Sequence, residues 1–391
     1  MSITSANFTD ISYIKEVTAG TTPATPAMQV LPTKGSSLQG NTSTVVSEAI
    51  RSDRQIDDLV IVDQEVSGAL EYEVSYTPYK PLLASLLQSA AIVGTLTAQV
   101  DVGFTATTEV INTGATDLSA LKAGQFIKVS GATDPANNGI FQLSIDATAS
   151  ELTLVTGSGL VTEAAGASVT ITANAFRNGV ATPDSYTFMK HITGVATPVF
   201  MYYRGCQISS ASFNFETGSI LGGSVNIVGL TEDVTETAIA GQTKVDAAAY
   251  TLMNSVSSLA ITGSGLSAGT AFQSLNLTVD NNINAAKAIG TLGATDLASF
   301  TLNVTADLTI YFEDKVAYDK YLQSTSFSVI ATATDGDDNT IVISLPNCKF
   351  ESLESPVPGK DNFFLLNGSL RALRDATNNY TVQFDLLDKH A

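Results

Sequence analysis

One β-rich pattern is present twice in this sequence, and the repeat constrains the fold more than any other feature. Each copy places a short strand around one of the only two cysteines, Cys206 and Cys348, which stand 142 positions apart. A second strand with small polar residues and glycine follows in each copy. The matching segments are Tyr203–Ile208 with Ile220–Ile227 in the first copy, and Leu345–Phe350 with Leu365–Ala372 in the second.

A strand that leads into a short helix precedes each copy. Leu70–Val74 leads into a helix expected over Tyr79–Ser89, and Leu308–Phe312 leads into one expected over Val316–Ser324. Both expected helices end in Leu-Gln-Ser. A repeated unit in a chain with no visible catalytic centre indicates a building block of an assembly. The alternative is that two Greek-key β domains look alike because β sequences carry little information.

Charge and composition exclude several classes of protein. The 391 residues suffice for two or three domains. The net charge is −19, so the chain cannot bind nucleic acid by neutralising phosphates with clustered Lys and Arg. Met1–Ser5 lacks the basic and apolar regions of a signal peptide, and the apolar run Pro81–Leu96 is too short and too polar to span a bilayer. The sequence therefore predicts neither secretion nor membrane insertion.

The pattern of strands and loops predicts four regions. Residues 1–50, rich in Thr, Ser, Pro and Gly, are expected to form an extended N-terminal arm or loop. Residues 51–94 and 175–230 are expected to form the first β unit, interrupted by a small β domain at 95–174. The inserted region shows short alternating strands about ten residues apart, a spacing typical of a small barrel or sandwich. Residues 231–391 are expected to hold a linker and the second unit.

Local signals predict several individual elements. Asp58–Val66 and Ala69–Tyr76 are expected to form a hairpin around Ser67-Gly68. Lys80-Pro81 is expected to start the first helix, because proline is tolerated at the first helical position. Further predicted elements are a short helix at Ala247–Met253 and a pair of strands near Phe363–Leu373 and Tyr380–Leu387.

The strands of both units alternate between apolar and small polar side chains. One face is expected to pack on a core and the other to meet water. The polar positions carry Ser, Thr and Asn with an occasional acid and no basic residue. An ordinary solvated sheet face remains the simpler interpretation, but such a face also suits a channel through which DNA slides without sticking. The candidate residues are Ser210, Ser212, Asn214, Glu216, Ser224, Asn226, Asn276, Thr278, Asp280, Asn303, Thr305 and Asp307, with Glu71 and Glu73 as further candidates.

No constellation of catalytic or metal-binding residues is visible, so we expect no enzyme, no cofactor and no metal site. His191 and His390 lie far apart, and neither has a Cys, Asp or His partner at metal-ligand spacing. The acidic cluster Asp335–Asn339 could bind calcium but is better explained as a hairpin turn. Cys206 and Cys348 are expected to be free thiols, buried as small apolar residues on equivalent strands.

Taken together, these segments resemble the tail tube proteins, or major tail proteins, of long flexible-tailed bacteriophages. The resemblance rests on the opening segment Tyr13–Pro23, on Ile50–Gln55 before the first hairpin, and on the two strand–helix–strand units. It extends over the chain outside 95–174. It is greatest to the larger, Chi-like members of siphovirus type, which carry a duplicated tube domain.

The resemblance implies a mainly β fold: duplicated tail-tube β-sandwich or barrel units, each with a short flanking α-helix, plus the small all-β inserted domain. It implies stacked rings of this chain in the virion tail, assembled in the host cytoplasm, around a tape-measure protein and later DNA. Two units per chain favour trimeric rings, with hexameric rings as the alternative. The arm would contact the next ring, and its candidate residues are Thr18, Thr22, Pro26, Thr33, Ser43 and Ile50.

Two other structural roles remain open at this point. A capsid or decoration protein would share the acidic β composition but would not need the doubled strand–helix unit. A surface adhesin would share the Thr and Asn richness but should carry a secretion signal.

Overall fold

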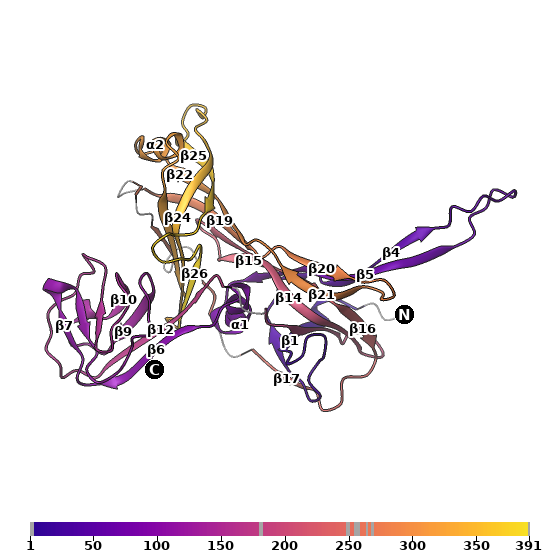
Figure 1. Cartoon of the computed structure of the whole chain (residues 1–391), viewed down its shortest axis with the longest axis horizontal. Coiled ribbons are helices and arrows are strands. Elements are labelled where there is room, and N and C mark those ends of the chain that lie inside the picture. The colour runs from indigo at the N-terminus through magenta and orange to yellow at the C-terminus, as the bar shows by residue number, and fades with distance from the viewer. Residues whose placement is uncertain are drawn as a thin grey trace.

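The computed structural model describes residues 4–179, 183–247, 251–253, 259–262, 265–266 and 270–389. The fold is mainly β, with two α-helices among the described residues. We call β1–β5, α1 and β13–β17 unit 1, β18–β26 and α2 unit 2, and β6–β12 the insert. Figure 1 shows unit 1 in the middle, with unit 2 rising from it and the insert at the far end.

The elements of unit 1 come from both sides of the insert in the chain. They are β1 (Thr9–Lys15), β2 (Ala27–Leu31), β3 (Gly35–Ser36), β4 (Gln39–Val46), β5 (Leu59–Glu73), α1 (Tyr76–Leu86), β13 (Tyr186–Ile192), β14 (Val199–Glu216), β15 (Gly222–Gly229), β16 (Thr231–Thr235) and β17 (Thr243–Val245).

The elements of unit 2 follow in an unbroken series. They are β18 (Leu259–Thr262), β19 (Phe272–Asp280), β20 (Ile283–Lys287), β21 (Ala294–Ser299), β22 (Asn303–Tyr311), α2 (Val316–Leu322), β23 (Phe327–Thr334), β24 (Thr340–Glu354), β25 (Leu365–Ala372) and β26 (Gln383–Leu387). The insert contains β6 (Ile92–Gln99), β7 (Gly103–Thr105), β8 (Val110–Asn112), β9 (Phe126–Ser130), β10 (Gly139–Gln142), β11 (Glu151–Thr153) and β12 (Val169–Arg177).

The two units share one pattern of strand pairing. In unit 1 the neighbours run β13–β14–β15–β5, and in unit 2 they run β23–β24–β25–β22, all antiparallel. The first half of β14 also pairs with β16, as that of β24 pairs with β26. The helix follows the equivalent strand in each unit, β5 or β22. The duplicated mainly β fold expected from the sequence is therefore confirmed, as sandwiches without a closed barrel.

A β-bulge in each long strand lets that strand serve two sheets. The ladder between β14 and β15 skips Ser209, and the ladder between β24 and β25 skips Glu351. A bulge bends a strand and increases its twist. The first half of β14 therefore pairs with β13 in an outer sheet, while its second half pairs with β19 of unit 2. The units are joined by this β14–β19 ladder.

The space between the sheets is filled mainly by aromatic and aliphatic side chains that are almost completely buried. Tyr72 stacks on Tyr79 of α1 with ring centroids 4.8 Å apart, and the Tyr72 hydroxyl donates to the Ser212 carbonyl at 3.0 Å. Burial of this phenol raises the pKa of Tyr72 above its ordinary value. Phe213 of unit 1 meets Phe384 of unit 2 edge to face at 5.6 Å, so one core runs through both units.

The insert has its own apolar core, formed around residues such as Phe104, Ile127 and Leu152. Its strand β12 pairs with β26, so the insert extends the outer sheet of unit 2 although the chain enters it from unit 1. Buried polar groups secure this junction. The Asp385 carboxylate accepts from the Phe126 amide at 3.0 Å and from Gln383 at 2.7 Å.

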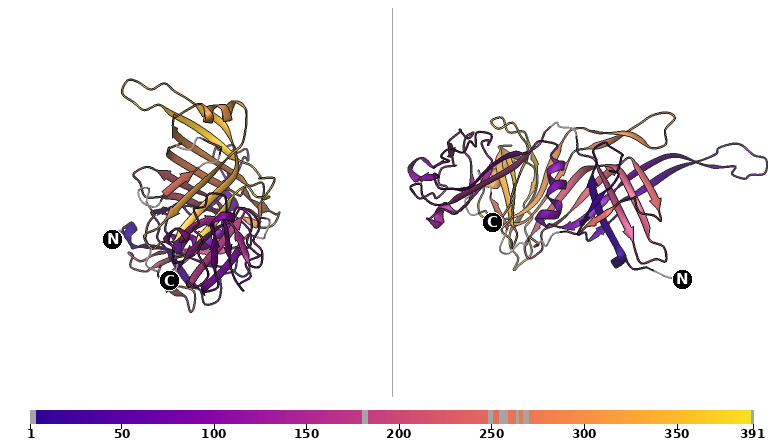
Figure 2. Two further views of the ribbon diagram at one scale, coloured as in Figure 1. Left: turned by 90° about the vertical axis from the view of Figure 1, so that its left-hand side faces the viewer. Right: turned by 90° about the horizontal axis from the view of Figure 1, so that it is seen from below.

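Residues 1–50 are not the extended arm that was expected. Strands β1 and β2 belong to the outer sheet of unit 1, where Tyr13 and Leu31 are buried in the main core. Their apolar residues are spaced closely enough to cover one sheet face, although the loops between them are rich in Thr and Pro. The segment that projects is instead the hairpin of β4 and β5, which extends beyond the body in Figures 1 and 2.

The expected hairpin around Ser67-Gly68 is wrong, because β5 runs straight through it and pairs with β4. Gly68 has φ +156°, and a Cβ there would lie 2.4 Å from Leu38 Cα. The glycine therefore marks a close approach of two backbones rather than a turn.

Helix α1 begins at Tyr76, with Ser75 as its N-cap, so Pro81 lies inside the helix instead of starting it. An interior proline costs about 3 kcal/mol by removing a hydrogen bond. The apolar face of the helix, with Leu82, Leu83 and Leu86 almost fully buried, offsets that cost.

Two further expectations are corrected near the end of the chain. The short helix predicted at Ala247–Met253 lies partly outside the described residues, and Met253 is extended against Val74. Strands β25 and β26 do not pair with each other, because both lie along the same side of β24. No helix in the described ranges is long and apolar enough to cross a membrane.

Candidate functional site: a polar sheet face shared by both units

Seven strands from the two units form one continuous antiparallel surface. Their order is β5–β15–β14–β19–β22–β25–β24, with β3 and β4 continuing beyond β5. Because side chains alternate along each strand, one face of this surface packs on the core and the other is open to solvent.

The pairing register places the polar side chains in rows across the strands. One row contains Glu71, Ser224, Ser212, Thr278, Thr305, Arg371 and Lys349. The next row contains Glu73, Gly222, Asn214, Asn276, Asp307, Ser369 and Ser352. We call this surface the polar face.

All the channel-lining candidates named from the sequence lie on the polar face. Those not in the two rows above are adjacent to them by register: Asn226 opposite Ser210, Ser210 opposite Asp280, Asp280 opposite Asn303, and Glu216 opposite Ser274. Sequence alternation alone thus identified one shared surface drawn from strands far apart in the chain.

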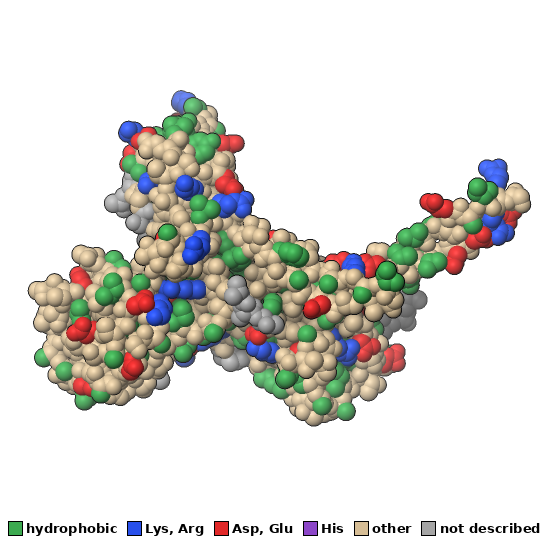
Figure 3. Space-filling model, in the orientation of Figure 1, with side chains coloured by type: hydrophobic (Ala, Val, Ile, Leu, Met, Phe, Trp, Pro, Cys, Tyr) green, Lys and Arg blue, Asp and Glu red, His purple; other side chains and the backbone are tan. Residues whose placement is uncertain are grey.

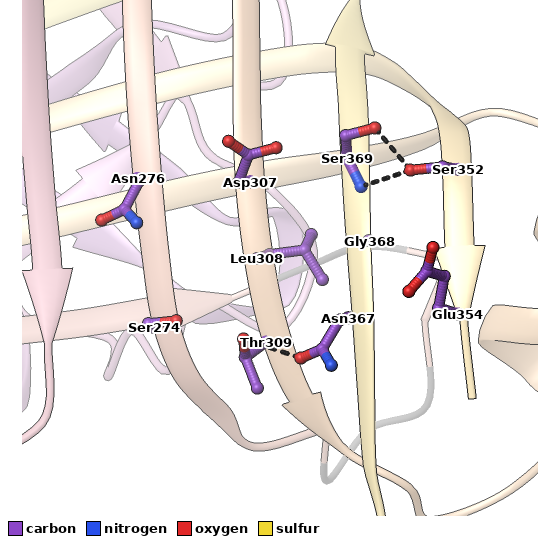
Figure 4. A pocket seen from close by; sticks show the side chains of 10 residues that line it. All are labelled: Ser274, Asn276, Asp307, Leu308, Thr309, Ser352, Glu354, Asn367, Gly368 and Ser369. Atoms are coloured by element: carbon purple, nitrogen blue, oxygen red, sulfur yellow. Dashed lines mark hydrogen bonds between the residues drawn. The ribbon is translucent and has the colours of Figure 1, made fainter. Parts of the chain in front are cut away.

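Short hydrogen bonds between neighbouring strands hold these side chains close to the sheet. Ser212 Oγ lies 3.0 Å from Ser224 Oγ, and Ser352 Oγ lies 2.7 Å from Ser369 Oγ. Thr309 donates to Asn367 at 3.1 Å, as Figure 4 shows. Because the hydroxyls and amides bond to one another, the face is polar but smooth, without long flexible side chains in its centre.

Sequence reasoning missed the basic residues at the edge of the polar face. Arg371 lies opposite both Thr305 and Lys349, and its guanidinium contacts the Glu351 carboxylate. At the opposite edge of the polar face, Lys34 Nζ lies 3.8 Å from Glu73 Oε1. The alternation of Asn367, Ser369 and Arg371 within β25 was a usable signal for Arg371. No comparable signal existed for Lys34, since it lies in a loop that tertiary contacts bring to the sheet.

The face has two shallow hollows of similar size, one in each unit. Each measures about 430 Å³. The hollow in unit 2 is lined by residues that include Asn276, Asp307 and Glu354, which Figure 4 shows on three different strands of the polar face. The hollow in unit 1 includes Glu71, Asn214 and Glu216 in its lining. Neither encloses a buried reactive group, so the arrangement offers an open hydrated surface rather than a catalytic cleft.

The residues proposed for an inter-ring arm do not lie together. Ser43 and Ile50 are on the projecting β4–β5 hairpin, whereas Thr22 is held in the body by hydrogen bonds to Thr187 and Arg204. Thr18, Pro26 and Thr33 occupy the loops around β2, also in the body. Figure 3 shows apolar side chains gathered at the base of the hairpin. The exposed apolar residues of the hairpin are Val45, Val46, Ile50, Ile56, Leu59, Val60, Ile61 and Val62.

The remaining candidates for chemistry have structural partners. Asp335 caps the β23–β24 turn, where its carboxylate accepts from the amides of Asp337 and Asn339 at 2.9 and 2.8 Å. His191 stacks on Phe200 at 4.3 Å in the outer sheet, while His390 lies outside the described residues. Among the described residues, no group of three or more His, Cys, Asp or Glu side chains could hold a metal ion.

Both cysteines are free and buried, as expected. Cys206 lies opposite Tyr186 and Cys348 opposite Phe327, each the first residue of the preceding strand, so their positions are equivalent. The register changes one detail of the repeat. Ser369 corresponds to Asn226 rather than to Ser224. Asn226 and Ser369 lie opposite Ser210 and Ser352, the first paired residues after the two bulges.

A comparison with protein families decides the wider assignment. The family model of the phage tail tube protein matches residues 9–362, which span unit 1, the insert and unit 2 as far as β24. The chain belongs to the phage tail tube protein family. This is a family of structural proteins and not of enzymes. Its members form the tube of the virion tail by self-assembly, so the chain is a tail component. A search of curated proteins finds no match.

Proposed function

We propose that this tail tube protein assembles into stacked rings with the polar face turned toward the lumen. The observation that carries the proposal is the continuity of the polar face across both units, since two tandem units with one shared inner surface resemble an arc of a ring. Its centre exposes hydroxyls, amides and carboxylates, and it lacks the lysine and arginine side chains whose neutralisation of phosphates drives binding to DNA. Such a lining would enclose a tape-measure protein during assembly and let DNA pass during ejection.

The proposed ring contains three chains. Each chain supplies two units of one pairing pattern, so three copies give six units in a pseudo-sixfold ring. Closing the sheet around the lumen would also remove the open strand edges that promote aggregation. A ring of six chains is the alternative. The duplicated unit favours a place for this protein in the long, flexible tail of a siphovirus of Chi-like type. Such a tail would be assembled in the host cytoplasm.

The proposed roles of the remaining parts follow from their positions. The separate apolar core of the insert supports its division from an interrupted first unit. Strands β16 and β17 lie in the region 231–391 that was expected to hold a linker and the second unit, but they pair with β14 and β2 of unit 1, so we place the start of the second unit at β18. The insert continues the outer sheet, on the side away from the polar face, so we place it on the tube exterior. The tip of the β4–β5 hairpin, where Ile50 and Ile56 are exposed, replaces residues 1–50 as the proposed contact between successive rings.

The test is assembly of the purified chain. Concentrated protein should sediment as a polymer and should appear in electron micrographs as hollow tubes with a regular axial repeat. Closed shells would favour a capsid role, and persistent monomers or solid fibres would favour an adhesin. Closed shells, persistent monomers or solid fibres would each contradict the proposed function.

A further inference from the structure

The seam between the two units of one chain is a template for a seam between chains. Within the chain, β14 of unit 1 pairs antiparallel with β19 of unit 2, over Ser210–Glu216 and Ser274–Asp280. Ser210, the first paired residue after the bulge, lies opposite Asp280, and Ser212 lies opposite Thr278.

Unit 2 has the equivalent of the β14 edge. The bulges at Ser209 and Glu351 align β14 with β24, so Ser352 corresponds to Ser210. In unit 1, this edge of β14 pairs with β19. On the equivalent edge of β24, no described strand pairs with Ser352–Glu354. The last three residues of β24 thus present an open edge.

Unit 1 has the equivalent of β19. Asp280 lies opposite Asn303 of β22. When β22 is aligned with its equivalent strand β5, Asn303 corresponds to Glu65. Glu65 lies opposite Asn41 of β4. Asn41 therefore corresponds to Asp280, and Gln39 corresponds to Thr278. Their strand pairs with β5 on one side, and no described strand pairs with its other side.

Side chains at equivalent positions of the two units differ in exposure. Those of unit 1 are covered by other parts of the chain, whereas those of unit 2 are open to solvent. Phe215, opposite Leu275 in the internal seam, is 2% exposed, whereas Val357, its counterpart by residue count from the bulges, is 85% exposed. Leu86 at the end of α1 is 0% exposed, whereas Leu322 at the end of α2 is 65% exposed.

The internal seam also shows what covers such a helix end. Asn281, directly after β19, donates through its side chain to the Leu86 carbonyl at 2.7 Å. The counterpart of Asn281 is Thr42 of β4. The hairpin of β4 and β5 is thus the element that would lie over Leu322, and it exposes Val45, Val46 and Val60. Apolar surface on both sides fits burial of one against the other.

We propose that Ser352–Glu354 of one copy pairs antiparallel with Gln39–Asn41 of the next copy. Ser352 lies opposite Asn41 and Glu354 opposite Gln39, while α2 packs under the neighbour's β4–β5 hairpin. This inference rests on the proposed ring and gives its register. Pro356 and Pro358 follow the strand and lack amide hydrogens, so the ladder between chains is shorter than the internal one.

Cysteine cross-linking of assembled protein tests the register. In one chain Asn41 and Ser352 lie on opposite edges of the sheet, about seven strand spacings of roughly 4.8 Å apart, so a bond between them must join two copies. The full chain carrying Asn41→Cys and Ser352→Cys should form disulfide-linked dimers and closed trimers under mild oxidation. The native cysteines are buried and should remain free.

A matched control distinguishes this register from a slipped one. Ser43→Cys with Ser352→Cys moves one thiol two residues along the same face of β4, and it should cross-link at least about ten times more slowly. Equal or reversed rates would overturn the register. Tubes that form without any cross-link at either pair would overturn the seam but leave the proposed function standing. A protein that neither assembles nor cross-links would contradict both.

A second variant tests the apolar part of the seam. Leu322→Asp changes an exposed side chain, so the single chain should keep its circular dichroism spectrum and its melting temperature while losing assembly at least about tenfold. Ile145→Asp changes a similarly exposed apolar residue, 54% exposed on the insert, and should assemble normally. Normal assembly of Leu322→Asp would contradict the proposed contact of α2.

Discussion

Cys206 and Cys348 occupy the same position in two copies of one strand pattern, each beside a bulge-bearing segment and opposite the first residue of the preceding strand. Both side chains are 0% exposed. Equivalent burial at equivalent positions shows that the two units pack alike around this part of the long strand. The tube fold is thus built twice around the same small, buried side chain.

We expect neither thiol to react in the folded protein. Burial raises the pKa of Cys348 to about 12 and also raises the pKa of Cys206 well above its ordinary value, so almost no thiolate is present near neutral pH. Labelling with a chromogenic disulfide should give no fast reaction before denaturation and two thiols per chain afterwards. Rapid labelling of a native cysteine would show that one of the two cores opens readily.

Stability should depend on pH through Asp385 at the junction of the insert with unit 2. Burial raises the pKa of this carboxyl from 3.8 to about 7. Between these values the folded state holds a proton that the unfolded chain has lost, so the free energy of unfolding falls as the pH rises from about 4 to about 7 and then levels off. The fall is on the order of 4 kcal/mol, since each pH unit contributes about 1.4 kcal/mol.

Denaturant unfolding at several pH values compares the chain with an Asp385→Asn variant. The variant should lack this component of the slope between pH ~4 and ~7, whatever its absolute stability. Identical slopes for the two proteins would show that Asp385 does not titrate in this range.

Replacement of Gly68 by alanine should be much more costly than the same change at Gly139. Both glycines have a similar φ, +156° and +152°, but a Cβ at Gly68 would lie within 2.5 Å of backbone atoms of Ser37 and Leu38, whereas a Cβ at Gly139 would meet nothing within 4 Å. The shared conformational strain costs about 1–3 kcal/mol. Overpacking against Leu38 adds about 1–3 kcal/mol for Gly68→Ala. Equal losses in chemical denaturation would contradict the close backbone approach.

Lysines added to the polar face should slow DNA passage without preventing ring formation. Asn214→Lys with Asn226→Lys adds two cations to exposed positions of the proposed lumen, where each would contact phosphates. Phage carrying both changes should eject DNA more slowly, with the largest effect at low salt. The matched control adds the same charge at Ala164 and Ala165, exposed on the insert, and should eject normally. Equal ejection rates would argue that the polar face is not the lumen.

The alternating strands could be predicted well from the sequence because their periodicity reflects a local property, the burial of one face. Ser212, Asn276 and Asp307 were assigned to one kind of surface on that basis, and the register places them on a single sheet. The repeat was visible for the same reason, since the two cysteines mark equivalent buried positions.

What could not be predicted depends on contacts between distant segments. Gly68 has the local signature of a turn, and only the approach of Leu38 explains its place inside a strand. Pro81 is a normal helix start by propensity, and only the buried face of α1 explains why the helix begins earlier. Lys34 reaches the polar face through tertiary packing alone.

The proposed ring is tested most directly by the symmetry of averaged end-on electron micrographs of assembled tubes. We expect three chains per ring, with six similar lobes around a hollow lumen and three inserts on the outside. Six chains per ring would keep the tail tube role but contradict the conclusion drawn from the duplicated unit. Rings whose inserts point into the lumen would contradict the assignment of the polar face.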